Sequence, residues 1–164
     1  MQWYLERLEE LGRTKPIYSV CGDDCAVCPR YLARTEEELH QTAVFWHQVG
    51  WRDRVVSNEE IRCRGCGTRQ SCAFMLLPCL QEKGHERCAK CGEYPCGRIG
   101  DMLARSAEKE EMCRRACGNE RMFAMLKRAF YEKEKNLFPK KGRVRPGMPA
   151  LMLDFAKDEG YNKV

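Results

Sequence analysis

The chain has 164 residues, a formal net charge of +5 and 12 cysteines. Its length suffices for one ordinary domain or two very small ones, and no window approaches the roughly 18 apolar residues of a membrane span, which excludes a transmembrane protein. The hydrophobic fraction of 43% includes the cysteines, so the residues left for a core are modest in number. Chains short of core are usually stabilised by disulfides or metals.

The first stretch of the chain, MQWYLERLEELG, is charged throughout and predicts a short amphipathic helix. It lacks the apolar run of a secretory signal, so we expect a cytoplasmic protein. Thiols stay reduced in that compartment, and the abundance of cysteine then indicates metal binding rather than disulfides.

Helix signals dominate the chain that follows. Thr35 and Glu38 form a capping box at the start of a helix that ends at Gly50. Residues 72–83 are mostly apolar and predict a further helix, which Pro78 should kink or split.

Two more helices are expected in the C-terminal third. Asp101 can cap a helix that runs to about Cys117, and Asn119 can cap the next one, which Pro139 stops. No segment shows the alternation of apolar and polar residues that is typical of a strand.

These elements predict a mainly α fold, a small and irregular cysteine-rich domain in which metal ions hold the loops and knuckles between short helices. Two parts are expected within it. Residues 1–100 would form the cysteine-rich metal-binding domain. Residues 101–164 would form a helical extension that contains a basic loop and packs on the first part.

The cysteines are the candidate functional residues, and they fall into four groups along the sequence. Two pairs, CRGC at 63–66 and CAKC at 88–91, have the form of zinc knuckles, in which a tight turn directs both sulfurs at one ion. The 21 residues between the pairs are close to the spacing at which two knuckles complete one tetrahedral zinc site. The candidate metal ligands are Cys21, Cys25, Cys28, Cys63, Cys66, Cys72, Cys79, Cys88, Cys91, Cys96, Cys113 and Cys117.

The opening stretch CGDDCAVC, residues 21–28, has the spacing by which three thiolates hold a [4Fe–4S] cluster in radical enzymes that use S-adenosylmethionine. Those enzymes need a large barrel around the cluster, which a chain of 164 residues without a βα repeat does not supply. The three cysteines then need a fourth ligand, for which Cys72, Cys79 and Cys96 are the candidates. The proline directly after Cys28 is also found in ferredoxin loops, so [4Fe–4S] clusters stay the alternative to zinc.

Cys113 and Cys117 lie four residues apart in an expected helix, so their sulfurs project from one face. Two interpretations stay open. The pair grips an ion completed by Cys72 and Cys79, or it packs as two buried thiols, which behave as small apolar residues.

A family resemblance rests on three of these motifs. CGDDCAVCPRY (21–31) resembles the opening motif of a bacterial and archaeal family catalogued as domain of unknown function 3795, and CRGC and CAKCGEYPC (88–96) resemble its second and third elements. The likeness covers residues 17 to about 100. It implies a metal-binding domain, usually taken to bind zinc, and it implies no activity. The matching positions are Cys21, Cys25, Cys28, Cys63, Cys66, Cys79, Cys88, Cys91 and Cys96.

The remaining features bear on partners. Residues 127–145 carry eight Lys or Arg against two Glu, which is typical of a solvated face or of a surface for an acidic partner. No phosphate loop, dinucleotide fingerprint or nucleophile elbow is present, and His85 is expected to be a surface side chain. We therefore favour a zinc-organised module that binds an unidentified protein partner. The alternatives are an iron–sulfur electron carrier and a nucleic-acid-binding zinc protein.

Overall fold

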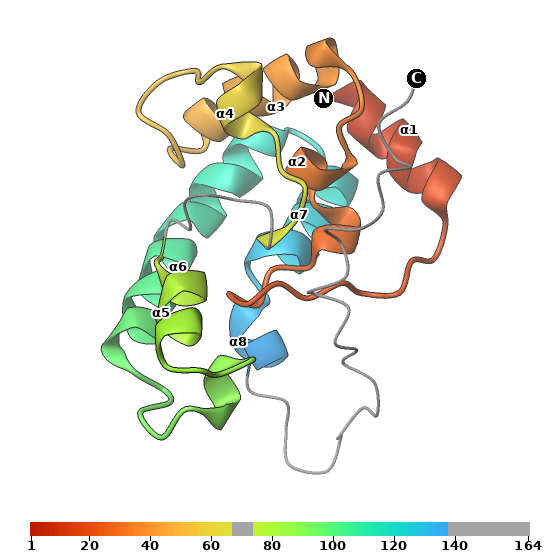
Figure 1. Ribbon diagram of the computed structural model, residues 1–164. Helices are drawn as coiled ribbons and strands as arrows, with labels where there is room; N and C mark the ends of the chain where they lie inside the picture. Colours follow the sequence, from red (N-terminus) through yellow and green to blue (C-terminus); the bar gives the residue numbers. More distant parts are fainter. Residues whose placement is uncertain (67–73, 138–164) are drawn as a thin grey trace.

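The computed structural model describes residues 1–66 and 74–137 (Figure 1). Within these two ranges the fold is helical and has no strand beyond an isolated bridge between Tyr18 and Asp24, which confirms the predicted mainly α class. The described helices are α1 (Gln2–Leu11), α2 (Pro29–Leu32), α3 (Glu36–Gln48), α4 (Asn58–Ile61), α5 (Leu76–Glu82), α6 (Gly97–Cys117), α7 (Glu120–Phe130) and α8 (Lys133–Leu137), with the 3-10 turns η1 (Cys25–Val27) and η3 (Cys88–Lys90).

Local signals explain where two of the longer helices begin. Thr35 caps α3 in a capping box, in which its hydroxyl accepts from the Glu38 N–H at 3.2 Å and the Glu38 carboxylate accepts from the Thr35 N–H at 3.0 Å. Asn119 caps α7, since its side chain accepts from the Met122 N–H at 3.0 Å. Both predicted helix starts are confirmed.

Two other helices begin elsewhere than predicted. α5 begins at Leu76, so Pro78 lies in its first turn, where backbone N–H groups have no partner within the helix and a proline is tolerated without a kink. α6 begins at Gly97, upstream of the expected cap Asp101, and Cys96 is its N-cap.

Two hydrophobic clusters hold the helices together. The larger cluster lies between α1, α3, α7 and the C-terminal half of α6, and its fully buried members include Leu39 and Leu126. The smaller cluster is formed by Leu76 of α5 together with Ile99 and Met102 of α6.

The long helix α6 connects the two clusters. It has 21 residues and is therefore about 31 Å long. Its first turns lie in the smaller cluster, while Cys113 and Cys117 near its end lie in the larger one. The expected boundary between residues 1–100 and 101–164 falls inside this helix, and the expected basic loop lies mostly beyond residue 137, outside the described residues.

None of the helices in residues 1–66 and 74–137 combines the length and the apolar character that crossing a lipid bilayer requires.

Candidate metal centres

Four cysteines from two separate parts of the chain lie close together beside the larger hydrophobic cluster. They are called the first cysteine group: Cys25, Cys28, Cys63 and Cys66. Negative charge on any of the other three raises the pKa of Cys25, and charge on Cys63 raises that of Cys28, so these sulfurs lie within electrostatic reach of Cys25 and of Cys28. The opening motif and the CRGC knuckle thus converge in space.

The elements around the first group explain this convergence. The Asp24 carboxylate caps η1 by accepting from the Ala26 N–H at 3.1 Å, and Cys28 is the N-cap of α2. The knuckle follows α4. The end of α4 is tied to α2, because Arg30 Nε donates to the Ile61 carbonyl at 2.8 Å.

Burial is the main cause of the raised thiol pKa values in this group. Cys28 is 6% exposed, and burial together with the charge of Cys63 raises its pKa to about 12, against the opposing effect of Arg30. Burial also raises the pKa of Cys25, and the neighbouring thiols raise it further. Buried thiolates this close repel one another, and a divalent cation among them removes that repulsion and replaces the lost hydration.

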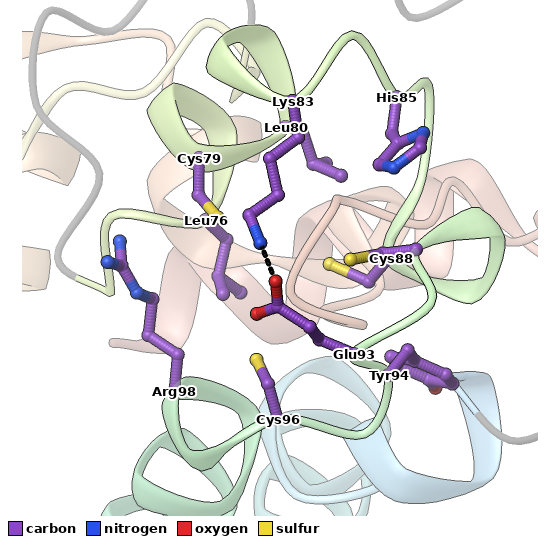
Figure 2. Close-up of a pocket in the computed structure, with 11 residues that line it drawn as sticks. Leu76, Cys79, Leu80, Lys83, His85, Cys88, Glu93, Tyr94, Cys96 and Arg98 are labelled. Carbon is purple, nitrogen blue, oxygen red and sulfur yellow. Dashed lines mark hydrogen bonds and ion pairs between the residues drawn. The ribbon is translucent and has the colours of Figure 1, made fainter.

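A second set of four cysteines lines one small pocket on the smaller hydrophobic cluster. It is called the second cysteine group: Cys79, Cys88, Cys91 and Cys96. Figure 2 shows the sulfur atoms of Cys79, Cys88 and Cys96 pointing toward the middle of the pocket. The pocket volume of about 30 Å³ leaves room for an ion or a few waters and is too small for a nucleotide or metabolite. Burial raises the pKa of Cys88, and the charges of Cys96, Cys79 and Cys91 add to it.

Three short elements position the second group. Cys79 lies on α5, Cys88 begins η3 and Cys91 follows it, and Cys96 stands at the start of α6. Cys96 is the N-cap of α6, so its side chain lies at the positive end of the helix dipole. An ion pair between Lys83 and Glu93 joins α5 to the loop that carries the knuckle (Figure 2).

Cys21 is held differently from the first group that it adjoins. Its thiol donates to the Asp23 carboxylate at 3.2 Å and lies 3.1 Å from the Ser19 hydroxyl. Its charge also acts on Cys25, but as the weakest of the four cysteine neighbours. The structure thus gives the Cys21 sulfur hydrogen-bonding partners of its own.

Cys113 and Cys117 are buried in the larger hydrophobic cluster, with 1% and 8% of their surfaces exposed. The two side chains hydrogen-bond to each other, and this bond together with burial raises the pKa of Cys117. Tyr131 also bonds to Cys113. Their surroundings resemble those of packed thiols rather than those of the second group.

The structure groups the cysteines differently from the sequence spacing. The spacing predicts that the knuckles 63–66 and 88–91 share one ion, whereas each knuckle lies in a different group. Cys79, which one of the two open interpretations joins to Cys113 and Cys117, lines the second pocket. The reason is tertiary, because Leu76 buries α5 against the start of α6, while α4 packs on α3. Cys72 lies outside the described residues.

No three His, Cys, Asp or Glu side chains in residues 1–66 and 74–137 already stand in an arrangement that holds an ion. The described cysteines therefore come near one another without full ligand geometry. Their role as metal ligands stays a prediction, which the donor chemistry of the two groups supports.

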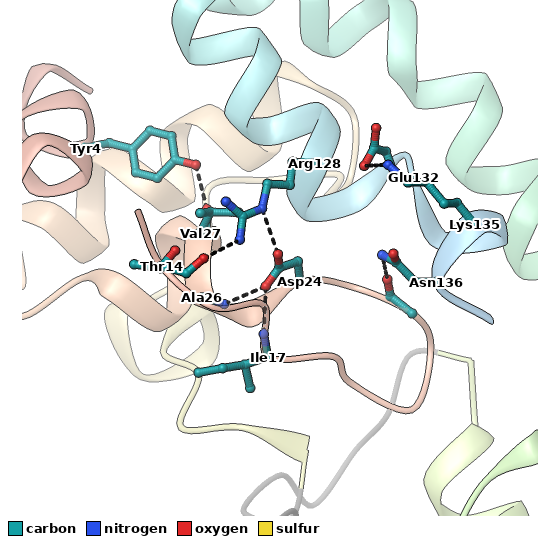
Figure 3. Close-up of polar contacts among 11 residues, drawn as sticks. Tyr4, Thr14, Ile17, Asp24, Ala26, Val27, Arg128, Glu132, Lys135 and Asn136 are labelled. Carbon is teal, nitrogen blue, oxygen red and sulfur yellow. Dashed lines mark hydrogen bonds and ion pairs between the residues drawn. The ribbon is translucent and has the colours of Figure 1, made fainter. Parts of the chain in front are cut away.

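Asp24 and Arg128 form a polar support for the opening motif that sequence reasoning missed. The Asp24 carboxylate is 2% exposed, accepts from the Ile17 N–H at 3.0 Å and from the Arg128 Nε–H at 2.8 Å (Figure 3). Arg128 also donates to the Thr14 carbonyl at 3.3 Å. The signal for Asp24 lay in the GDDC motif, but nothing local pointed to a partner 104 residues away.

Comparison with known proteins gives one result. No curated protein and no solved structure is significantly similar to this chain. A family described as protein of unknown function, DUF3795, matches residues 17–101, which hold both cysteine groups and end just after the start of α6. The match covers more than half of the chain, which therefore belongs to the DUF3795 family.

Proposed function

We propose that this chain is a cytoplasmic zinc protein in which each of the two cysteine groups binds one ion, and that the body so stabilised is a binding or regulatory module for another protein. The observation that carries the proposal is the convergence of cysteines from separate segments into two sets of four. Cysteine is too reactive and too rarely clustered for two such sets to serve packing alone.

The donor chemistry suits zinc. Four thiolates around a tetrahedral ion are typical of structural zinc sites, which are closed and leave no position for a substrate. The small volume of the second pocket fits a single ion better than a four-iron cluster. Zinc bound there supplies cross-links between segments and no reaction chemistry, so an enzymatic role is not part of the proposal.

The charges of the described residues favour a protein partner over nucleic acid. Two zinc sites with four thiolates each carry −4 together, which brings the formal net charge from +5 to about +1. The basic residues of the expected cationic stretch that are described each form an ion pair with an acid of the protein: Lys127, Arg128, Lys133 and Lys135. Little unpaired positive charge is left on this part of the stretch to bind phosphates.

The cytoplasmic part of the proposal rests on the chemistry of the proposed ligands. Thiols that bind metal must stay reduced, which is the condition of the cytoplasm.

Metal analysis and an absorption spectrum of the full chain, purified without oxygen, test the proposal. We expect a colourless protein that contains zinc and loses its helical circular dichroism when a strong chelator removes the metal. A brown protein containing iron would establish the iron–sulfur alternative instead. If the protein is purified without metal, or keeps its helical circular dichroism after the chelator has removed all metal, the proposal is overturned.

A further inference from the structure

The five-residue helix α8 lies between the opening loop, residues 19–24, and the loop of residues 88–96 (Figure 1). The sequence predicts one helix from Asn119 to Pro139, whereas α7 ends at Phe130 and α8 follows as a separate element. α8 lies beyond the residues matched by the family, so the family motifs alone do not account for it.

On one side, α8 contacts the opening loop, residues 19–24. The Lys133 side chain is 3% exposed and forms an ion pair with the Asp23 carboxylate, while its Nζ lies 4.0 Å from the Cys21 sulfur. Asn136 Nδ2 donates to the Gly22 carbonyl at 2.8 Å (Figure 3).

Gly22 allows this close approach. Its φ of +82° is in the left-handed region that favours glycine. A Cβ at this position would lie 2.9 Å from both the Leu137 Cγ and the Lys133 carbonyl oxygen, so any other residue would push α8 away. The opening loop and α8 are therefore shaped for each other.

On its other side, α8 contacts the loop of the second cysteine group. The Tyr94 hydroxyl donates to the Leu137 carbonyl at 2.8 Å. Leu137 packs on the smaller hydrophobic cluster, which Cys88 and Cys96 also contact. One short helix thus joins the opening loop to the second group.

The helix cannot hold this position by itself. Isolated helices shorter than about 12 residues are marginal in water, and a buried lysine is tolerated only while its partner is present. The order of α8 therefore depends on both the opening loop and the Tyr94 loop keeping their conformation.

We propose that α8 is a metal-dependent latch, which docks only while the opening loop and the loop of residues 88–96 are both held in place. It follows that loss of the ion from the second group releases α8 and loosens the opening loop beside the first group. This inference rests on the proposed zinc function. It adds communication between the two groups, carried by Lys133, Asn136 and Leu137.

Hydrogen exchange of the zinc-loaded full chain, read by mass spectrometry, tests the latch. Tyr94→Phe removes the hydroxyl that reaches α8 and leaves all cysteines in place. We expect exchange in α8 and in residues 19–24 to rise about fivefold, the loss that one hydrogen bond represents. Glu86→Gln is the control, because among the described residues the side chain of Glu86 pairs only with Lys90, four residues away on the surface, and contacts neither α5 nor α8. Faster exchange confined to residues 88–96 in Tyr94→Phe would overturn the latch.

The second variant is Cys91→Ser, which removes one ligand of the second group. We expect one zinc fewer per chain together with faster exchange in α8 and the opening loop. A chain that loses this zinc while α8 exchanges as in the wild type would overturn the latch and leave the zinc function intact. A wild-type chain without metal would overturn the zinc function and the metal dependence of the latch, and the Tyr94→Phe result would still decide whether α8 joins the two loops.

Discussion

The two cysteine groups differ in what surrounds them. The first group lies beside the larger hydrophobic cluster, where Val27, between Cys25 and Cys28, is 2% exposed and its carbonyl accepts from the hydroxyl of the fully buried Tyr4. The second group lies on a cluster with only three fully buried apolar side chains among the described residues, and its four cysteines are all partly exposed, whereas Cys28 of the first group is buried. Since metal binding contributes to folding free energy, the proposed ion in the first group would stabilise the body of the protein, whereas the proposed ion in the second group would stabilise a peripheral loop.

The largest expected effect is a difference in stability between a cysteine variant of the first group and one of the second group. Cys28→Ser should lose one zinc and unfold the larger cluster, because the ion's contribution is comparable to the whole stability of about 5–15 kcal/mol of a small domain. Cys91→Ser should also lose one zinc but retain a cooperative thermal transition of the larger cluster. Metal analysis measures the zinc content of each variant, and thermal melting followed by circular dichroism measures its stability. Equal melting of the two variants would remove the distinction between the groups.

The next largest effect is the loss of stability expected when the buried charge of Asp24 is removed. Asp24→Asn removes the charge that Arg128 faces and weakens the cap of η1, which should lower the free energy of unfolding by about 3 kcal/mol. Urea unfolding measures it. Arg54→Met is a suitable control, because the ion pair of Arg54 with Glu60 is exposed and its loss should leave the midpoint unchanged. If both variants unfold at the wild-type midpoint, the polar support of the first group is unimportant.

A kinetic difference follows from exposure. A chelator added to the zinc-loaded chain should remove zinc in two phases, the fast one from the second group, since all its ligands are partly exposed, whereas Cys28 of the first group is buried in the larger cluster. Zinc release followed with a chromogenic chelator measures the phases. Cys91→Ser should lack the fast phase. If Cys91→Ser lacked the slow phase instead, the slow phase would come from the second group, which would contradict the prediction.

The smallest effect concerns the helical pair. Cys113→Ala combined with Cys117→Ala should keep the wild-type zinc content and lower the free energy of unfolding by about 2 kcal/mol, as expected when small buried side chains are truncated. Metal analysis and urea unfolding measure the two quantities. Loss of one zinc from this double variant would make the pair metal ligands and restore a third site.

The sequence predicted the features that depend on neighbouring residues. Thr35 with Glu38, and Asn119 alone, mark helix starts because a cap is completed within four residues. The family motifs also identified the cysteine-rich body. Spacing did not predict which knuckle meets which cysteine, because Leu76 and Ile99 decide that by packing α5 on α6. It did not predict the pairing of Lys133 with Asp23 either, since the two lie 110 residues apart.

The central claim is that the chain holds two zinc ions, one in each group of four cysteines. Native mass spectrometry of the full chain, purified without oxygen, counts the ions directly. The account predicts two zinc ions per wild-type chain and one in Cys91→Ser. A wild-type chain without zinc, or a Cys91→Ser chain that keeps both ions, would contradict it.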